Sequence, residues 1–253
     1  MDILSVLFRW LHIAAGILWI GLLYWFNFVN VPFAATMDGE TKRKVVPEML
    51  PRSLYWFRWG AAYTWVTGLL LLLLVFYHGG LMFEQDNTEG WGTGAIVMLI
   101  VVFAGFQLYN MLAKSALAKN QKVFAAVSFV LIALVIYLMI NFGGFSYRAY
   151  VIHTGALFGT IMAANVWMII WPAQKKVITA IKEGTAPDAA LMAQAGMRSR
   201  HNTYLSVPLV WMMINAHTTV PGADSWFYLL AVIAIGWLAV SMVYKKAAKV
   251  KGF

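Results

Sequence analysis

Long apolar runs dominate the chain, and charged residues, Gly or Pro separate one run from the next. A helix that crosses the hydrocarbon core of a bilayer needs about 20 mostly apolar residues. The pattern predicts an all-α integral membrane protein, a bundle of seven transmembrane helices that forms a single domain over residues 1–253. The predicted spans are residues 4–30, 56–78, 94–115, 121–141, 149–172, 202–219 and 226–244.

Two connecting segments are longer and more polar than the rest, residues 31–55 and 173–201. The second contains the turn residues Gly184, Pro187 and Asp188 and has room for one short surface helix. The apolar run of the first span is too long for a signal peptide, and no small-residue cleavage pattern follows it. We therefore expect the first span to remain in the protein as a helix.

Composition supports the membrane assignment. Of the 253 residues, 62% are hydrophobic and only 11% are charged, a ratio that one soluble core of this length cannot hide. The 12 Trp, 11 Tyr and 16 Phe suit a protein with many rings at lipid–water interfaces. The chain has no Cys, which excludes disulfides, thiolate metal sites, iron–sulfur ligation and covalent c-type haem attachment by this chain.

The net charge of +9 indicates orientation rather than nucleic-acid binding, because basic residues in membrane proteins gather on cytoplasmic loops. All of the 19 Lys and Arg residues except Arg9 and Arg148 fall on the odd-numbered loops and the C-terminal tail. This asymmetry predicts an outside N-terminus and a cytoplasmic C-terminus. In a bacterium the protein is then a multi-pass protein of the inner membrane, with its outer side in the periplasm.

Four of the five histidines gather at the predicted outer face: His12, His78, His153 and His217. The fifth, His201, opens the sixth span at the cytoplasmic face. Ionisable side chains inside a membrane are costly and usually face the bundle interior, so the outer histidines are candidate functional residues. A structural role, in which each histidine hydrogen-bonds a neighbouring helix, is the alternative.

A b-type haem fits this pattern, because histidine nitrogens on facing helices can hold the iron without a covalent link. Gly16 lies one turn deeper than His12, and Gly155 begins a small-residue seam on the fifth span. Each glycine either admits a macrocycle or allows close helix packing. Arg9 and Arg148 can pair with haem propionates, although arginines at helix ends also extend to the interface without a ligand.

A mononuclear copper or zinc site built from three of the four outer histidines is the competing interpretation. The sequence alone does not separate three-histidine copper from two-histidine haem. We favour haem b because the surroundings are aromatic and rich in glycine, and we keep copper as the alternative.

A second cluster stands at the cytoplasmic start of the sixth span, and its members are Arg198, Arg200, His201, Asn202 and Tyr204. One interpretation is structural, with Asn202 or Thr203 capping the helix and the arginines following the positive-inside rule. The other is recognition of a planar anion, since Arg and Asn donate hydrogen bonds to carboxylate-like or purine oxygens. No phosphate loop, zinc-protease motif or Ser-His-Asp order is visible.

Several ordered strings resemble the membrane domain of the bacterial membrane-bound urate oxidases, also called urate hydroxylases. The resemblance covers nearly the whole chain. The strings are Arg9-Trp10-Leu11-His12 continuing through Gly16, Trp19, Ile20, Gly21 and Tyr24 to Asn27-Phe28-Val29, the segment from His153 to Asn165, and Arg198-Ser199-Arg200-His201-Asn202-Thr203-Tyr204 followed by Ser206-Val207-Pro208 and Ala216-His217.

The resemblance implies a membrane enzyme that oxidises urate to 5-hydroxyisourate and passes electrons to cytochrome c. It further implies that His12, His153 and His217 are the redox-cofactor histidines and that His201 with Asn202 form the inner-face catalytic motif. Family members typically continue into a further span and a cytochrome c domain, whereas this chain has seven predicted spans and no Cys. The expected electron acceptor is therefore a separate c-type cytochrome.

Two other functions fit the same sequence. One is a non-catalytic haem-bearing or structural subunit of a larger respiratory membrane complex. The other is a transporter, for which mid-depth polar groups and broken helices are expected, but Asn165 and Pro208 are the main features of that kind.

Overall fold

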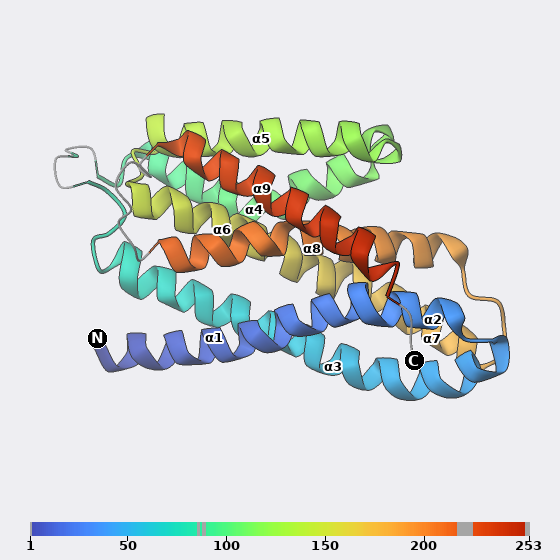
Figure 1. The fold of residues 1–253 in the computed structure, drawn as a ribbon. Coiled ribbons are helices and arrows are strands. Elements are labelled where there is room, and N and C mark those ends of the chain that lie inside the picture. The colour runs from blue at the N-terminus through green and yellow to red at the C-terminus, as the bar shows by residue number, and fades with distance from the viewer. Residues whose placement is uncertain (1, 85–86, 88–89, 217–224, 251–253) are drawn as a thin grey trace. The chain divides into compact units, whose positions relative to one another are not determined.

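The computed structural model describes residues 2–84, 87, 90–216 and 225–250, and these residues form helices and connecting turns without a β-strand (Figure 1). The all-α prediction is confirmed. The helical segments are α1 (Asp2–Tyr24), η1 (Trp25–Asn30), α2 (Val31–Thr36), α3 (Gly39–Leu71), η2 (Leu72–Tyr77), α4 (Thr93–Lys114), η3 (Ala116–Lys119), α5 (Gln121–Asn141), α6 (Tyr147–Ala164), η4 (Asn165–Ile170), α7 (Trp171–Lys182), α8 (Ala189–Asn215) and α9 (Trp226–Ala247).

Within the described residues, six helical stretches are long and apolar enough to cross a membrane. Many of their large apolar side chains are exposed, as expected where lipid replaces water. The protein is therefore a multi-pass membrane protein, and its direction across the membrane stays a prediction. The six stretches are Ile3–Thr36, Gly39–Tyr77, Thr93–Lys114, Gln121–Asn141, Tyr147–Lys182 and Trp226–Ala247.

The sixth predicted span, residues 202–219, falls on α8 and is not among these six stretches. Helix α8 begins well before that span, and its first half carries Arg198, Arg200 and Asn202, which lower its average hydropathy. Residues 217–219 lie outside the described part of the chain.

The two polar connections are more helical than the sequence pattern indicates. Residues 31–36 and 39–55 belong to α2 and α3, and most of 173–201 belongs to α7 and α8. The stretch Gly39–Tyr77 has 39 residues, about 58 Å of helix at 1.5 Å per residue. That length is nearly twice the hydrocarbon core of about 30 Å, so the polar end of α3 continues as a helix outside the bilayer. The turn at Gly184 is confirmed, with a φ of +72°.

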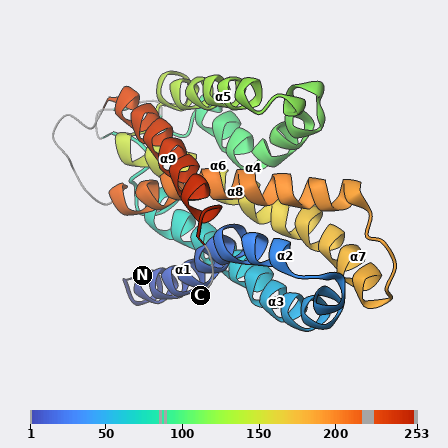
Figure 2. The ribbon, with the colours of Figure 1, turned by 45° about the vertical axis from the view of Figure 1, so that its right-hand side comes forward.

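The described residues fall into two compact units. Unit 1 comprises the described parts of Met1–Leu70, Met162–Val207 and Gly236–Phe253. Unit 2 comprises those of Leu71–Ile161 and Pro208–Ile235. In unit 1, α7 lies beside the polar half of α3 in both ribbon views (Figure 2), and the Arg58 guanidinium stacks on the Trp171 ring at 4.0 Å.

Three helical stretches contain a wider π-helical turn, namely η1, η2 and η4. Two of them have a direct cause in the sequence, because Pro32 and Pro172 lack the N–H that a regular helix needs. The neighbouring amides bond five residues back instead, Val31 to the Phe26 carbonyl and Trp171 to the Val166 carbonyl. Such turns change which residues face a neighbouring helix and are frequent at functional sites.

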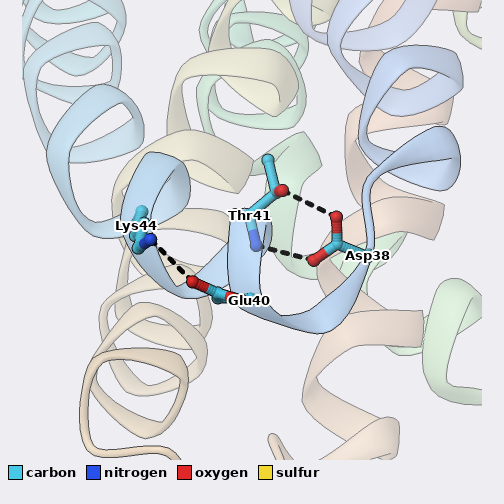
Figure 3. A network of polar contacts seen from close by, with 4 residues as sticks. All are labelled: Asp38, Glu40, Thr41 and Lys44. Carbon is cyan, nitrogen blue, oxygen red and sulfur yellow. Dashed lines mark hydrogen bonds and ion pairs between the residues drawn. The ribbon is translucent and has the colours of Figure 1, made fainter.

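Helix α3 begins at an exposed capping network in its polar end, and Asp38 lies between two of the candidate spans (Figure 3). The Asp38 carboxylate accepts hydrogen bonds from the Thr41 backbone N–H at 2.9 Å and from its hydroxyl at 2.7 Å. One turn further, Lys44 pairs with Glu40 at 2.7 Å. The bonds from the Thr41 backbone and then its side chain lower the pKa of Asp38, because they favour the charged carboxylate.

Carbon-13 carboxyl NMR titration of the detergent-solubilised protein should therefore place the pKa of Asp38 below that of a free Asp side chain. Because the folded-state pKa is lowered, the cap stabilises α3 above the unfolded-state pKa and loses this effect as pH falls through the folded-state pKa. Thr41→Val should raise the pKa of Asp38, whereas Thr36→Val, whose hydroxyl bonds the Phe33 carbonyl, should leave it unchanged. A wild-type pKa at or above the ordinary value contradicts this assignment.

Candidate functional site

His12 lies on α1 in unit 1, and α3 fixes its ring. Nδ1 lies 2.8 Å from the Thr64 carbonyl oxygen and 3.2 Å from the Thr67 hydroxyl. Since a carbonyl can only accept, Nδ1 carries the proton and Nε2 has the lone pair. An N–H anchored on a backbone carbonyl is the usual support of a metal-binding histidine, so His12 fits an axial ligand.

Gly68 provides the space for this ring. A Cβ added at Gly68 would lie 2.9 Å from Cε1 of His12, which is too close for an ordinary contact. The missing side chain therefore lets the imidazole lie directly against α3. The ring is partly buried, and its orientation is set by contacts within unit 1.

His153 lies on α6 in unit 2 and is completely buried. Its Nδ1 lies 2.7 Å from the Ala149 carbonyl and its Nε2 lies 2.9 Å from the Tyr77 hydroxyl. Nδ1 therefore donates, and the lone pair of Nε2 accepts the hydroxyl proton. The rings of Phe76, Tyr77 and Phe145 surround it. For iron to bind at Nε2, the Tyr77 hydroxyl would have to turn away.

The two remaining outer histidines are His78 and His217. His78 is exposed at the end of η2, and His217 lies outside the described residues. Among the residues that the structure describes, no group of three His, Cys, Asp or Glu side chains is placed to hold a metal ion. His12 belongs to unit 1, whereas His78 and His153 belong to unit 2.

The glycines and arginines assigned to a haem pocket have the following surroundings. A Cβ on Gly16 would lie 3.7 Å from the Thr64 methyl group, and one on Gly155 would lie 2.9 Å from the Met213 methyl group. A neighbouring helix therefore lies at ordinary contact distance from a Cβ at Gly16 and closer than that to a Cβ at Gly155. Arg9 is exposed and Arg148 is partly buried.

Asn202 of the predicted inner-face motif lies in a buried polar centre of unit 1. Asn165 of η4 donates from Nδ2 to Oδ1 of Asn202 at 2.8 Å, and Asn202 donates from Nδ2 to the Met162 carbonyl at 2.9 Å. Asn165, Asn202 and Arg198 are each 0% exposed. A guanidinium and two amides therefore lie inside the protein on facing segments of α8 and η4.

Another face of α8 carries a second polar group of contacts. Asn27 of η1 donates to the Ser199 hydroxyl at 2.8 Å and accepts from the Tyr244 hydroxyl at 2.9 Å. The hydroxyls of Ser206 and Tyr24 lie 3.0 Å apart, and Ser206 donates to its own helix at the Thr203 carbonyl. Since Ser206 has one proton, Tyr24 is the donor of this pair.

His201 and Asn202 do not face the same way. Successive residues of an α-helix point about 100° apart, and Asn202 is directed toward η4 by its hydrogen bonds. His201 is partly buried, with the Arg198 and Arg200 charges close to it. The structure therefore joins Asn202 of α8 with Asn165 of η4, and Arg198 lies one turn earlier on the same face of α8 as Asn202.

The hydrogen bonds of Tyr77 and Asn27 were not predicted from the sequence. Asn27 and Asn165 stood there within strings that resemble the family, and Asn165 also as a transporter feature. A common signal was present, because each of these polar residues interrupts an apolar run. All three also lie in π-helical turns, Asn27 in η1, Tyr77 in η2 and Asn165 in η4. The prolines that follow η1 and η4 mark two of these turns in the sequence.

Residues 1–251 match the model of the family described as Urate oxidase N-terminal. A search of curated proteins finds no match, and neither does a search of solved structures.

The pairing of Asn165 with Asn202 can be measured by a double-mutant cycle. Asn202→Leu and Asn165→Leu should each lower the free energy of unfolding by about 1–3 kcal/mol, because each leaves a buried amide without its partner. The double variant should lose less than the sum, with a coupling of about 0.5–2 kcal/mol. Reversible unfolding in mixed micelles measures all four proteins.

Asn141→Leu is the matched control for this cycle, because Asn141 is exposed and its amide bonds only the Tyr137 carbonyl one turn away on its own helix. It should show no coupling to Asn165→Leu. Strictly additive losses for Asn165 and Asn202 would show that the two amides do not stabilise each other.

Proposed function

The chain belongs to the urate oxidase N-terminal family, and we propose that it is a membrane-bound oxidoreductase that oxidises urate. The reaction adds water to urate and gives 5-hydroxyisourate, two electrons and two protons. The electrons pass to a separate c-type cytochrome on the periplasmic side of the bacterial inner membrane. The asymmetric distribution of basic residues supports this orientation.

The observation that carries the proposal is the buried polar centre of unit 1. Urate is a planar anion with carbonyl oxygens and ring nitrogens along its edges. The planar guanidinium of Arg198 donates to such oxygens in a fixed geometry, and the amides of Asn165 and Asn202 can both donate and accept. Because all three side chains are fully buried, their attraction for an anion is little screened by water.

A b-type haem is the proposed redox cofactor, and the donor geometry fits it at His12. The lone pair of Nε2 is the atom that would ligate iron, while Thr64 holds Nδ1. When bound, a haem accepts and releases one electron at a time. His153 becomes a second candidate ligand only if Tyr77 releases its Nε2. A copper ion remains the alternative cofactor, with His217 as a candidate ligand outside the described residues.

A second function is favoured by one specific observation. The amides of Asn165 and Asn202 already bond each other and the Met162 carbonyl, and such a closed chain stabilises helix packing without any ligand. This arrangement suits a non-catalytic haem-bearing subunit of a respiratory complex, which would carry electrons but ignore urate.

A reduced-minus-oxidised spectrum of the purified protein tests the redox proposal directly. We expect a b-type spectrum that urate reduces. His12→Ala should abolish the signal of the haem that it ligates, whereas the exposed His78→Ala should leave it in place. Haem that urate does not reduce supports the subunit function, and a protein without haem contradicts the cofactor assignment and directs attention to copper analysis.

Tyr77→Phe tests whether His153 ligates iron or only accepts a hydrogen bond from the Tyr77 hydroxyl. The variant removes the hydroxyl that occupies Nε2, so an iron ligand at His153 would be retained or bound more fully. We expect haem per protein, measured as the pyridine haemochrome, to be unchanged or higher in Tyr77→Phe and lower in His153→Ala. Loss of haem in Tyr77→Phe with full retention in His153→Ala would exclude His153 as a ligand.

A further inference from the structure

One face of α1 and η1 is directed into unit 1. Its members recur at helical spacing and include His12, Gly16, Trp19, Leu23 and Asn27. Trp19 is 1% exposed, seven residues or about 10.5 Å along the helix from His12. It also lies eight residues or about 12 Å from Asn27, which bonds Ser199 of α8. Trp19 thus stands between the proposed redox ligand and the contacts of α8.

The indole nitrogen of Trp19, Nε1, is a buried donor without a hydrogen-bond partner in the described part of the protein. An indole N–H is a donor and cannot accept. Buried donors in native proteins are nearly always paired with protein, water or ligand, so this group calls for an acceptor.

The backbone of Trp19 packs closely against α3. A Cβ on Gly60 of α3 would lie 3.3 Å from both the backbone nitrogen and the Cβ of Trp19. The two helices therefore meet at this point, and the base of the indole is held against α3. A buried donor on a closely packed backbone is suited to orienting a ligand atom.

Unit 1 contains another buried N–H donor without a partner in the described residues. This donor is Nε of Arg58, two residues before Gly60. Its guanidinium stacks on Trp171 at 4.0 Å, which fixes its plane. Both groups are N–H donors and one is cationic, so together they favour an oxygen-rich anion.

We propose that Nε1–H of Trp19 donates a hydrogen bond to an oxygen of a planar anion bound inside unit 1. The inference rests on the proposed function for the two anions that meet this description, the urate substrate and a carboxylate of the haem. In either case Trp19 is a binding residue that orients the ligand on the face of α1 that also carries His12.

The indole proton can be observed directly in the full-length protein. Nitrogen-15 tryptophan labelling gives one Nε1–H signal for each tryptophan, and the signal missing from Trp19→Phe identifies Trp19, with Trp19→Tyr as a second assignment variant. Spectra of haem-free and haem-loaded protein, each with and without urate, should show this signal moving downfield when its acceptor binds. The Trp10 signal is the control, because Trp10 is 67% exposed on the same helix.

Affinity provides the second readout. Loss of one hydrogen bond to an anion should weaken urate binding about tenfold in Trp19→Phe, while Trp10→Phe should bind urate as the wild type does. A downfield shift on urate addition together with weaker urate binding identifies the substrate as the partner. A shift that appears only on haem loading, with faster haem loss from Trp19→Phe, identifies the haem carboxylate.

The outcomes keep this inference separate from the proposed function. If urate binds the wild type and Trp19→Phe equally, and the Trp19 signal stays fixed in all four states, the inference is wrong and the proposed function stands. If urate does not bind the wild type, the urate proposal fails and the haem-loaded spectra alone decide the role of Trp19. A protein that binds neither anion overturns both.

Discussion

A polar group inside a bilayer is costly unless it is paired, and this cost shapes the arrangement of the helices. The clearest case is the chain of bonds from Asn165 through Asn202 to the Met162 carbonyl. It ties α8 to the end of α6 and η4 at a point where neither lipid nor water can replace the partners. Arg198, one turn before Asn202, is likewise 0% exposed.

Two π-helical turns, η1 and η4, carry the asparagines that bond α8. Pro32 and Pro172 remove amide donors, and the wider turns that precede them carry Asn27 and Asn165. A π-helical turn contains more residues than an α-helical turn, so it shifts the face on which the following side chains lie. The same prolines that would be expected to break helices thus direct amides toward α8.

The two described intramembrane histidines show how identical side chains acquire different chemistry. Each donates from Nδ1 to a backbone carbonyl, His12 to Thr64 and His153 to Ala149. They differ at Nε2, because the Tyr77 hydroxyl occupies that atom in His153. His12 is therefore the better prepared metal ligand, although both residues stood at matching depth in the sequence pattern.

Sequence alone determined the all-helical membrane fold, because apolar runs of spanning length leave a chain no other way to pair its backbone in lipid. It also selected Asn202 and the arginine-rich start of the sixth span, since polar residues are costly there. Only the tertiary structure decided which nitrogen of each histidine is free, because that depends on carbonyls and hydroxyls supplied by neighbouring residues. The pairing of Asn165 with Asn202 and the unbonded indole of Trp19 were equally out of reach of the sequence, since helix packing alone places residues that are distant along the chain in contact.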